Sequence, residues 1–210
     1  MRQSPVQAMP ANVLSAPIVV SGFGSYGGRV RNASLCMGRS MVTGQSDTAF
    51  VEMPVVWGMP GTWVARRTLP PRAWIALGEA EGALRLEAVA CNRRSAHPDT
   101  LGNLPPAMDI MPGPRHMLCT APLPRITAAL ISAGFPASIS DNAGGYLCNE
   151  LFYHLITRNT TAWQHQTLVL FVHIPPFGTA TSQADRPVID TSYLASLGET
   201  LLTTVRQCLS

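Results

Sequence analysis

The 210-residue sequence has few charged residues and no long apolar run. Asp, Glu, Lys and Arg make up 13% of the chain, about half of the share usual in globular proteins. The 15 basic and 12 acidic residues leave a formal net charge of +3, without a dense basic cluster. Such a balance argues against nucleic acid as a partner. No apolar stretch reaches the length of about 18 residues that a membrane-spanning helix needs, so we expect no membrane partner.

The sequence also lacks the cysteine pattern of a disulfide framework or a metal site. Its 5 cysteines are an odd number and lie far apart, and no Cys-x-x-Cys or His-x-x-x-His spacing occurs. We therefore expect reduced thiols, a cytoplasmic location, no metal and no cofactor. Near the N-terminus, Pro5, Pro10 and Pro17 interrupt the apolar residues. That pattern does not fit a signal peptide, and residues 1–15 are interpreted as a flexible leader.

Short apolar runs alternate with helical patterns along the rest of the chain. Residues 167–174 (TLVLFVHI) are apolar almost throughout, which predicts a central strand that is covered on both faces. This alternation predicts a single α/β domain over 16–210, a three-layer α/β/α structure with a central mixed, mostly parallel sheet. Residues 93–122 are rich in Pro and Gly and are interpreted as a long ordered loop. We expect further strands at 17–21, 49–56, 74–78, 84–91 and 137–140, and helices at 123–133, 146–159 and 191–208.

The segment DNAGGYLCNELFYHL, residues 141–155, contains the first candidate for chemistry. Two glycines turn the chain, and Cys148 follows close to the expected start of a helix. Unpaired backbone N–H groups and the positive end of the helix dipole favour a thiolate there, and the same N–H groups can hold an oxyanion. Most intracellular cysteines are nevertheless buried apolar residues without chemistry, so position alone does not establish a nucleophile.

Two further residues complete a candidate triad. His173 ends the central strand just before Pro175, at the edge where ligands of open α/β sheets gather. Glu87 lies between apolar residues in LRLEAVACN, where a buried carboxylate needs a partner and could orient a histidine. A structural histidine and an outward-facing glutamate are the alternatives.

These residues lie in sequence blocks that resemble the pyroglutamyl peptidase I (pyrrolidone carboxyl peptidase) family of cysteine peptidases. The family's glycine-rich loop and the Asn-Pro-Ser that follows it match GFGSYGG at 22–28 and NAS at 32–34. Its glutamate block matches EAVACN at 87–92, its nucleophile block AGGYLCN at 143–149, and its histidine block FVHIP at 171–175. The resemblance covers the chain from about residue 17 to its end, and the blocks occur in the family's order.

The resemblance implies a Glu87–Cys148–His173 triad that removes an N-terminal pyroglutamyl residue from peptides through a thioester. It implies that Phe23 and Tyr26 enclose the pyroglutamyl ring. N-terminally pyroglutamylated peptides are then the partners, and a homodimer or homotetramer is expected. The matching blocks imply a set of substrate-binding residues, and an acidic residue lies near them. Together these residues are Phe23, Tyr26, Asn32, Glu79, Tyr146 and Leu147.

The sequence departs from the family outside the triad. Glu79 and Glu81 stand where the family usually has Gly-Gln-Ala-Gly-Gly-Arg, and Ala96 stands where it has an arginine that Arg93 or Arg94 could replace. These changes leave open a weak or inactive homologue that binds pyroglutamyl peptides without cleaving them. An amidase for a related lactam or acyl group is the other alternative.

Overall fold

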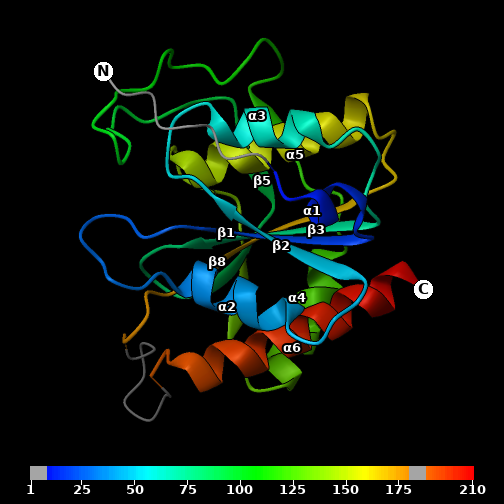
Figure 1. The fold of residues 1–210 in the computed structure, drawn as a ribbon. Coiled ribbons are helices and arrows are strands. Elements are labelled where there is room, and N and C mark those ends of the chain that lie inside the picture. Colours follow the sequence, from blue (N-terminus) through cyan, green and yellow to red (C-terminus); the bar gives the residue numbers. More distant parts are fainter. Residues whose placement is uncertain (1–8, 180–187) are drawn as a thin grey trace.

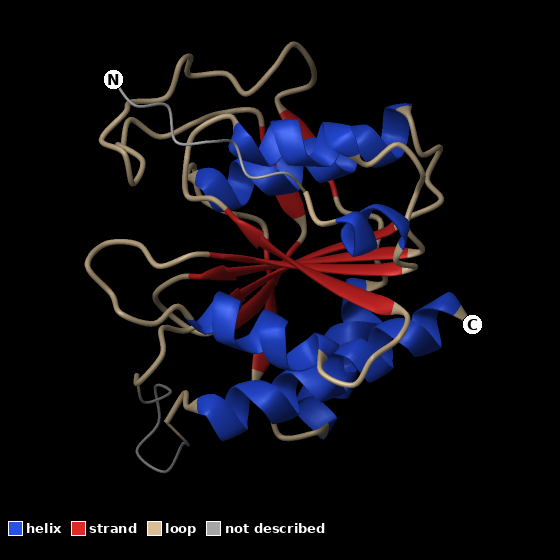
Figure 2. Ribbon diagram, viewed as in Figure 1, coloured by secondary structure: helices blue, strands red, loops and turns tan. Residues whose placement is uncertain are grey.

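The computed structural model describes residues 9–179 and 188–210. A sheet crosses the middle of the molecule, with helices on both sides (Figure 2). It has six strands in the order β2-β1-β3-β8-β4-β7. The first four strands of that order run parallel, and β4 turns antiparallel to β8 while staying parallel to β7. The expectation of a mixed, mostly parallel sheet is confirmed. The strands are β1 Ile18–Phe23, β2 Thr48–Met53, β3 Ala73–Glu79, β4 Leu84–Glu87, β7 Ala137–Ser140 and β8 Leu168–Ile174.

Helices cover both faces of this sheet and make the three layers that the sequence predicts (Figure 1). On one face lie α2 (Ala33–Val42), α4 (Leu123–Ser132) and α6 (Thr191–Leu209). On the other lie α3 (Met59–Arg66) and α5 (Leu147–Thr161). Strand β8 lies between β3 and β4 and is buried along nearly its whole length, as expected for a strand covered on both faces.

The expectation of one strand over 84–91 is wrong. The chain leaves the main sheet after Glu87, and β5 (Val89–Cys91) pairs with β6 (His116–Leu118) in a separate two-stranded sheet. Strand β6 also lies inside the segment that was expected to be a loop. The Asn149 side chain accepts from the Cys91 N–H (2.8 Å) and donates to its carbonyl (2.7 Å), so β5 hydrogen-bonds to α5 instead of the main sheet.

Part of the segment expected to be a leader packs on the domain. Residues 11–15 form the short helix α1 (Ala11–Ser15), whose Val13 is fully buried. The buried Arg67 guanidinium donates to the carbonyls of Val13 and Ala16. Residues 1–8 of that segment lie outside the described part of the chain.

Candidate active site

Strand alternation places three polar side chains on the α5 face of the sheet. In β8, Val172 and Ile174 face the cluster under α2, α4 and α6, whereas Phe171 belongs to the cluster on the α5 side. His173 therefore points toward α5, as successive strand residues face opposite sides. The same alternation in β4, with Leu84 and Leu86 on the far side, turns Arg85 and Glu87 toward α5.

Glu87 and His173 form a buried pair. Glu87 Oε1 lies 2.6 Å from His173 Nδ1, and the two side chains are 0% and 4% exposed. A carboxylate in such a place is costly without a donor, and this contact supplies one. It also fixes the imidazole so that Nε2 is the ring nitrogen left for another group. The outward-facing alternative for Glu87 does not hold.

Cys148 is the second residue of α5, and its sulfur and the His173 ring both lie close to Gly78. A Cβ atom on Gly78 would lie 2.8 Å from Cys148 Sγ and 3.0 Å from His173 Cδ2, the ring carbon bonded to Nε2. The thiol and the free side of the imidazole are therefore neighbours, and the missing side chain at position 78 gives them room. The three residues expected to form the triad come together from α5, β4 and β8.

Burial raises the pKa of the Cys148 thiol to about 12, and the negative charge of Glu87 adds to the shift. Hydrogen bonding from its own backbone N–H at the start of α5 acts in the opposite direction. In this site, burial outweighs the helix N-terminus that the sequence analysis invoked. The thiol is protonated at neutral pH, so attack on a carbonyl requires a base to remove its proton.

Aromatic rings gather beside the start of α5. The Tyr26 and Tyr146 ring centroids are 5.1 Å apart, and Trp57 packs edge-on against Tyr146 at 5.1 Å. The Tyr146 hydroxyl donates to the Pro98 carbonyl at 3.0 Å, and burial followed by contact with Tyr26 raises the pKa of that phenol. Phe23, at the end of β1, is buried. Trp57 was not expected here from the sequence.

The other expected substrate-binding residues hold the frame of the site. Asn32 caps α2 by accepting from the Ser34 N–H at 2.9 Å, and its amide donates to the Gly24 carbonyl at 3.2 Å. Glu79 accepts from the Ala33 N–H at 2.5 Å and from Arg29 at 2.6 Å. Asn32 thereby ties the glycine-rich loop to the start of α2, and Glu79 ties Arg29 and the start of α2 to the end of β3.

The residues near the expected arginine position divide into a buried and an exposed group. Arg94 is buried, donates to Glu150 Oε1 at 2.7 Å, and bonds the carbonyls of Ala107, Asp109 and Ile110. It therefore anchors the long loop to α5. Ala96 and Arg93 are exposed.

Leu147, the last of the expected substrate-binding residues, is buried in the core at the first position of α5.

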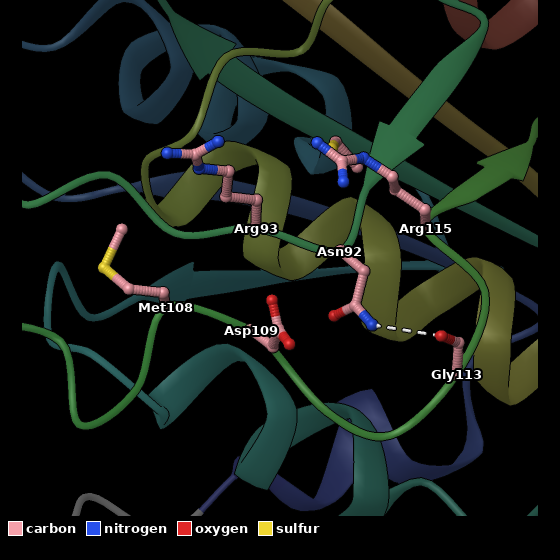
Figure 3. A pocket seen from close by; sticks show the side chains of 7 residues that line it. Asn92, Arg93, Met108, Asp109, Gly113 and Arg115 are labelled. Carbon is pink, nitrogen blue, oxygen red and sulfur yellow. Dashed lines mark hydrogen bonds between the residues drawn. The ribbon is translucent and has the colours of Figure 1, made fainter.

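Arg93 belongs to a polar cavity of about 290 Å³ beside β5 (Figure 3). In this view the Arg93 and Arg115 side chains both point upward, and Asn92 and Asp109 lie below them. A second cavity of about 440 Å³ shares Cys91, Arg93 and Met108 with it, and reaches Asn142, Gly144 and Gly145. The two cavities thus adjoin, and together they run from the turn before the Cys148 helix to Arg115.

Within residues 9–179 and 188–210, no group of three or more His, Cys, Asp or Glu side chains is arranged to hold a metal ion. The helices in these ranges are all too short or too polar to cross a membrane. All five cysteines are free.

Comparisons with known proteins show to which family the chain is similar. The model of the pyroglutamyl peptidase family matches residues 16–193. The chain is 32% identical over 167 residues to a pyrrolidone-carboxylate peptidase of Gloeobacter violaceus, with 75% of this chain and 80% of that protein covered. It is 31% identical over 198 residues to a pyrrolidone-carboxylate peptidase of an Enterobacter species, with 89% and 91% covered.

The fold is also similar to a solved structure. The crystal structure of pyroglutamyl peptidase I from Bacillus amyloliquefaciens superposes with a TM-score of 0.75 at 26% identity. The superposition covers 90% of this chain and 93% of that one.

Proposed function

Because the chain belongs to the pyroglutamyl peptidase family, we propose that it hydrolyses the amide bond after an N-terminal pyroglutamyl residue, with Cys148, His173 and Glu87 as the catalytic triad. One observation carries the assignment of these residues. Glu87 bonds His173 Nδ1 at 2.6 Å, and Cys148 Sγ lies beside the opposite side of the same ring. An orienting carboxylate, a base and a nucleophile in that order are what acyl transfer needs.

The reaction follows from this order of groups. His173 Nε2 takes the proton from Cys148 Sγ as the sulfur attacks the substrate carbonyl, which forms a tetrahedral oxyanion. The N–H groups at the start of α5 stabilise that charge. The intermediate collapses to a thioester as His173 gives the proton to the leaving amine. Water, deprotonated by His173, then hydrolyses the thioester and restores the thiol.

The glycine-rich loop and the turn before α5 would hold the pyroglutamyl ring. Tyr26 and Tyr146 offer aromatic surface. The Phe23 and Leu147 side chains are buried in the core cluster on the same side of the sheet and would support that surface from within. A neutral lactam needs such walls and a few backbone hydrogen bonds, and no carboxylate to bind an amine. Asn32 and Glu79 contribute by fixing the loop through α2.

The two adjoining cavities are where we place the peptide beyond the scissile bond. They begin at Gly144 and Gly145, close in sequence to Cys148, and continue to Arg93 and Arg115. Guanidinium groups recognise carboxylates, so an acidic side chain or a C-terminal carboxylate fits there.

We further propose that the enzyme works in the cytoplasm as a homodimer or homotetramer. Five free cysteines are compatible with a reducing compartment, and the oligomeric state is the one that the family resemblance implies. Light scattering coupled to size-exclusion chromatography measures the molar mass in solution, and a monomer would contradict the second part.

Release of a fluorescent amine from a pyroglutamyl-amide substrate tests the proposed function. We expect saturable turnover between about pH 6 and 9, and none with Cys148→Ala. The prolyl analogue, which lacks the lactam carbonyl, serves as the matched control substrate. Folded protein that turned over both substrates equally, or neither, would contradict the proposed substrate class.

A further inference from the structure

Arg85 contacts the carboxylate of the Glu87–His173 pair. Its Nε donates at 3.1 Å to Glu87 Oε1, the same oxygen that bonds His173 Nδ1. The antiparallel register of β4 and β8 also places Arg85 directly across from His173. The guanidinium, the carboxylate and the imidazole therefore form one chain of contacts on the α5 face of the sheet.

The guanidinium is held in place by main-chain carbonyls. Arg85 Nη1 donates to the carbonyl of Glu81 at 2.9 Å and to that of Ala83 at 3.3 Å. Both carbonyls belong to the turn before β4, where Gly82 has φ +98°. Because these two carbonyls hold the guanidinium, Arg85 is oriented toward Glu87 without a bound substrate.

Glu87 needs a permanent positive partner. The carboxylate is fully buried, and within the described residues its Oε2 has no hydrogen-bond partner. A buried carboxylate needs donors beyond a single imidazole, because its charged form is poorly solvated. A guanidinium stays charged over the whole working range, and it is 22% exposed here, so its own burial cost is modest.

We propose that Arg85 is a positioning residue that keeps Glu87 ionised and aimed at His173, and that its charge sets the pH range in which Cys148 and His173 work together. The proposal deepens the proposed function, since it rests on the triad assigned there. Arg85 acts through Glu87, whose carboxylate it contacts.

The charges that face Cys148 from each packed element support this role. Burial and then Glu87 raise the pKa of the thiol to about 12, with a further contribution in the same direction from Glu79, at the end of β3. Arg85 acts in the opposite direction. Tyr146, from the turn before α5, also faces the thiol, and Arg29 pairs with Glu79.

Loss of the Arg85 charge acts on the triad through Glu87. A buried carboxylate without a positive partner is poorly stabilised in its charged form, and a neutral group at this position no longer orients His173 by its charge. The acidic limb of the pH profile should therefore move upward. A purely structural loss would instead reduce activity by a similar factor at every pH.

The test compares Arg85→Gln with Arg85→Lys. For Arg85→Gln we expect kcat/KM to fall by about tenfold at pH 7 and its acidic limb to move up by about one pH unit, the usual spread of perturbed groups. The rate of Cys148 alkylation by iodoacetamide, followed by peptide mapping, should shift in the same direction. Arg85→Lys, which keeps the charge, should leave the limb near its wild-type position.

Two controls separate this role from a loss of structure. Arg206→Gln breaks an Arg–Asp pair with Asp47, at the opposite end of the strands, and should leave both pH profiles unchanged. In a Glu87→Gln background, Arg85→Gln should cost little more, because the group through which it acts is already neutral. Additive losses in the double variant, or an unmoved limb in Arg85→Gln, would overturn the proposal.

The alkylation experiment also separates this proposal from the proposed function. If wild-type protein fails to cleave the pyroglutamyl substrate, yet Arg85→Gln shifts the pH profile of Cys148 alkylation as expected, the substrate class is refuted and the role of Arg85 is supported. If Arg85→Gln does not fold, Arg85→Lys carries the test. A lysine variant whose limb rises by a full unit would then overturn the proposal, since the charge is retained.

Discussion

Single residues fix the distances in the candidate site, and Gly78 is as constrained as the triad. The Cβ of any other residue at this position would meet Cys148 Sγ, His173 Cδ2 and Phe171 Cε1 at 2.8, 3.0 and 3.1 Å. Real Cβ contacts are longer than this, so a side chain here must move the sulfur or the imidazole. Small displacements of reacting groups have large effects on rate.

We therefore expect Gly78→Ala to lower kcat by about 10²-fold, because the thiol and the imidazole are pushed apart. Thermal unfolding should show a smaller relative effect, since a single methyl group at the edge of the core can be accommodated in part. Gly198→Ala is a matched control, as its Cβ would meet the flexible side chain of Met41, at 2.7 Å, on the other face of the sheet. Wild-type kcat in folded Gly78→Ala would contradict the arrangement.

Glu87 distinguishes a triad from a Cys–His dyad. Glu87→Gln keeps the shape and removes the charge that orients His173 and stabilises its protonated form. We expect turnover to fall by about 10²–10⁴-fold, the usual contribution of a positioned acid–base group. Cys148→Ser should lose nearly all activity, because a hydroxyl ionises far less readily than a thiol. Near-normal turnover by folded Glu87→Gln would make the carboxylate structural.

The sequence predicted the residues with an evident chemical role and missed those that support them. A helix start, a strand end and a carboxylate among apolar residues made Cys148, His173 and Glu87 candidates, and only the resemblance to the family's blocks favoured them over structural roles. Arg85 was missed although it lies two residues before Glu87, and the period of two in a strand puts both on one face. Gly78 and Trp57 could not be found this way, since their contacts depend on how β3 and α3 pack against α5.

At the scale of the elements, α5 both carries a residue of the candidate site and packs against the neighbouring helix α3. Its first turn carries Cys148, and later turns pack on α3, where His154 lies against Gly61. Burial, with a smaller contribution from the charge of Arg94, lowers the pKa of His154 to about 4, from a usual value of 6.5. The folded protein therefore keeps this imidazole neutral in a pH range where the unfolded chain protonates it.

This difference predicts a pH-dependent stability. Between pH 6.5 and about 4 the unfolded state binds the additional proton, so the contribution of His154 is fully present above pH 6.5 and is lost as the pH falls toward 4. The loss in the free energy of unfolding should approach about 3 kcal/mol. Urea unfolding at several pH values measures it. His154→Gln should flatten the slope and His165→Gln should not, whereas an unchanged slope in His154→Gln would refute the cause.

The elements were predicted better than their connections. Helices α4 and α6 and strands β7 and β8 lie within one or two residues of the expected positions, because their apolar patterns are long or clearly bounded. The break after Glu87 was not predictable from alternation, since LRLEAVAC reads as one strand. It depends on Asn149, more than fifty positions later in the chain, whose amide pairs with the Cys91 backbone.

At the scale of the whole molecule, the long loop builds a surface beside the site. Arg94 and Asn92 fasten it from within, through Glu150 and through the carbonyl of Met111. Two exposed arginines, Arg93 and Arg115, remain at the cavity that this loop encloses. The loop thereby adds positive charge on the side where the peptide beyond the scissile bond is proposed to lie.

We expect Arg93→Gln and Arg115→Gln to raise KM by about three- to tenfold for pyroglutamyl peptides with an acidic residue after the ring, the range of a partly exposed charge pair. The same variants should leave KM unchanged for a small pyroglutamyl-amide substrate, which does not reach the cavity. Arg125→Gln, on the exposed side of α4, is the control. Equal effects on both substrates would place the arginines elsewhere in the mechanism.

The central claim is that Cys148 carries the pyroglutamyl group during turnover, and the mass of the covalent intermediate tests it most directly. A pyroglutamyl ester acylates quickly, so acid quenching in the first turnovers should trap the thioester for peptide mapping. The account predicts one pyroglutamyl group on the peptide that contains Cys148, and none in Cys148→Ser. Acylation of another cysteine, or steady hydrolysis without any adduct on Cys148, would contradict it.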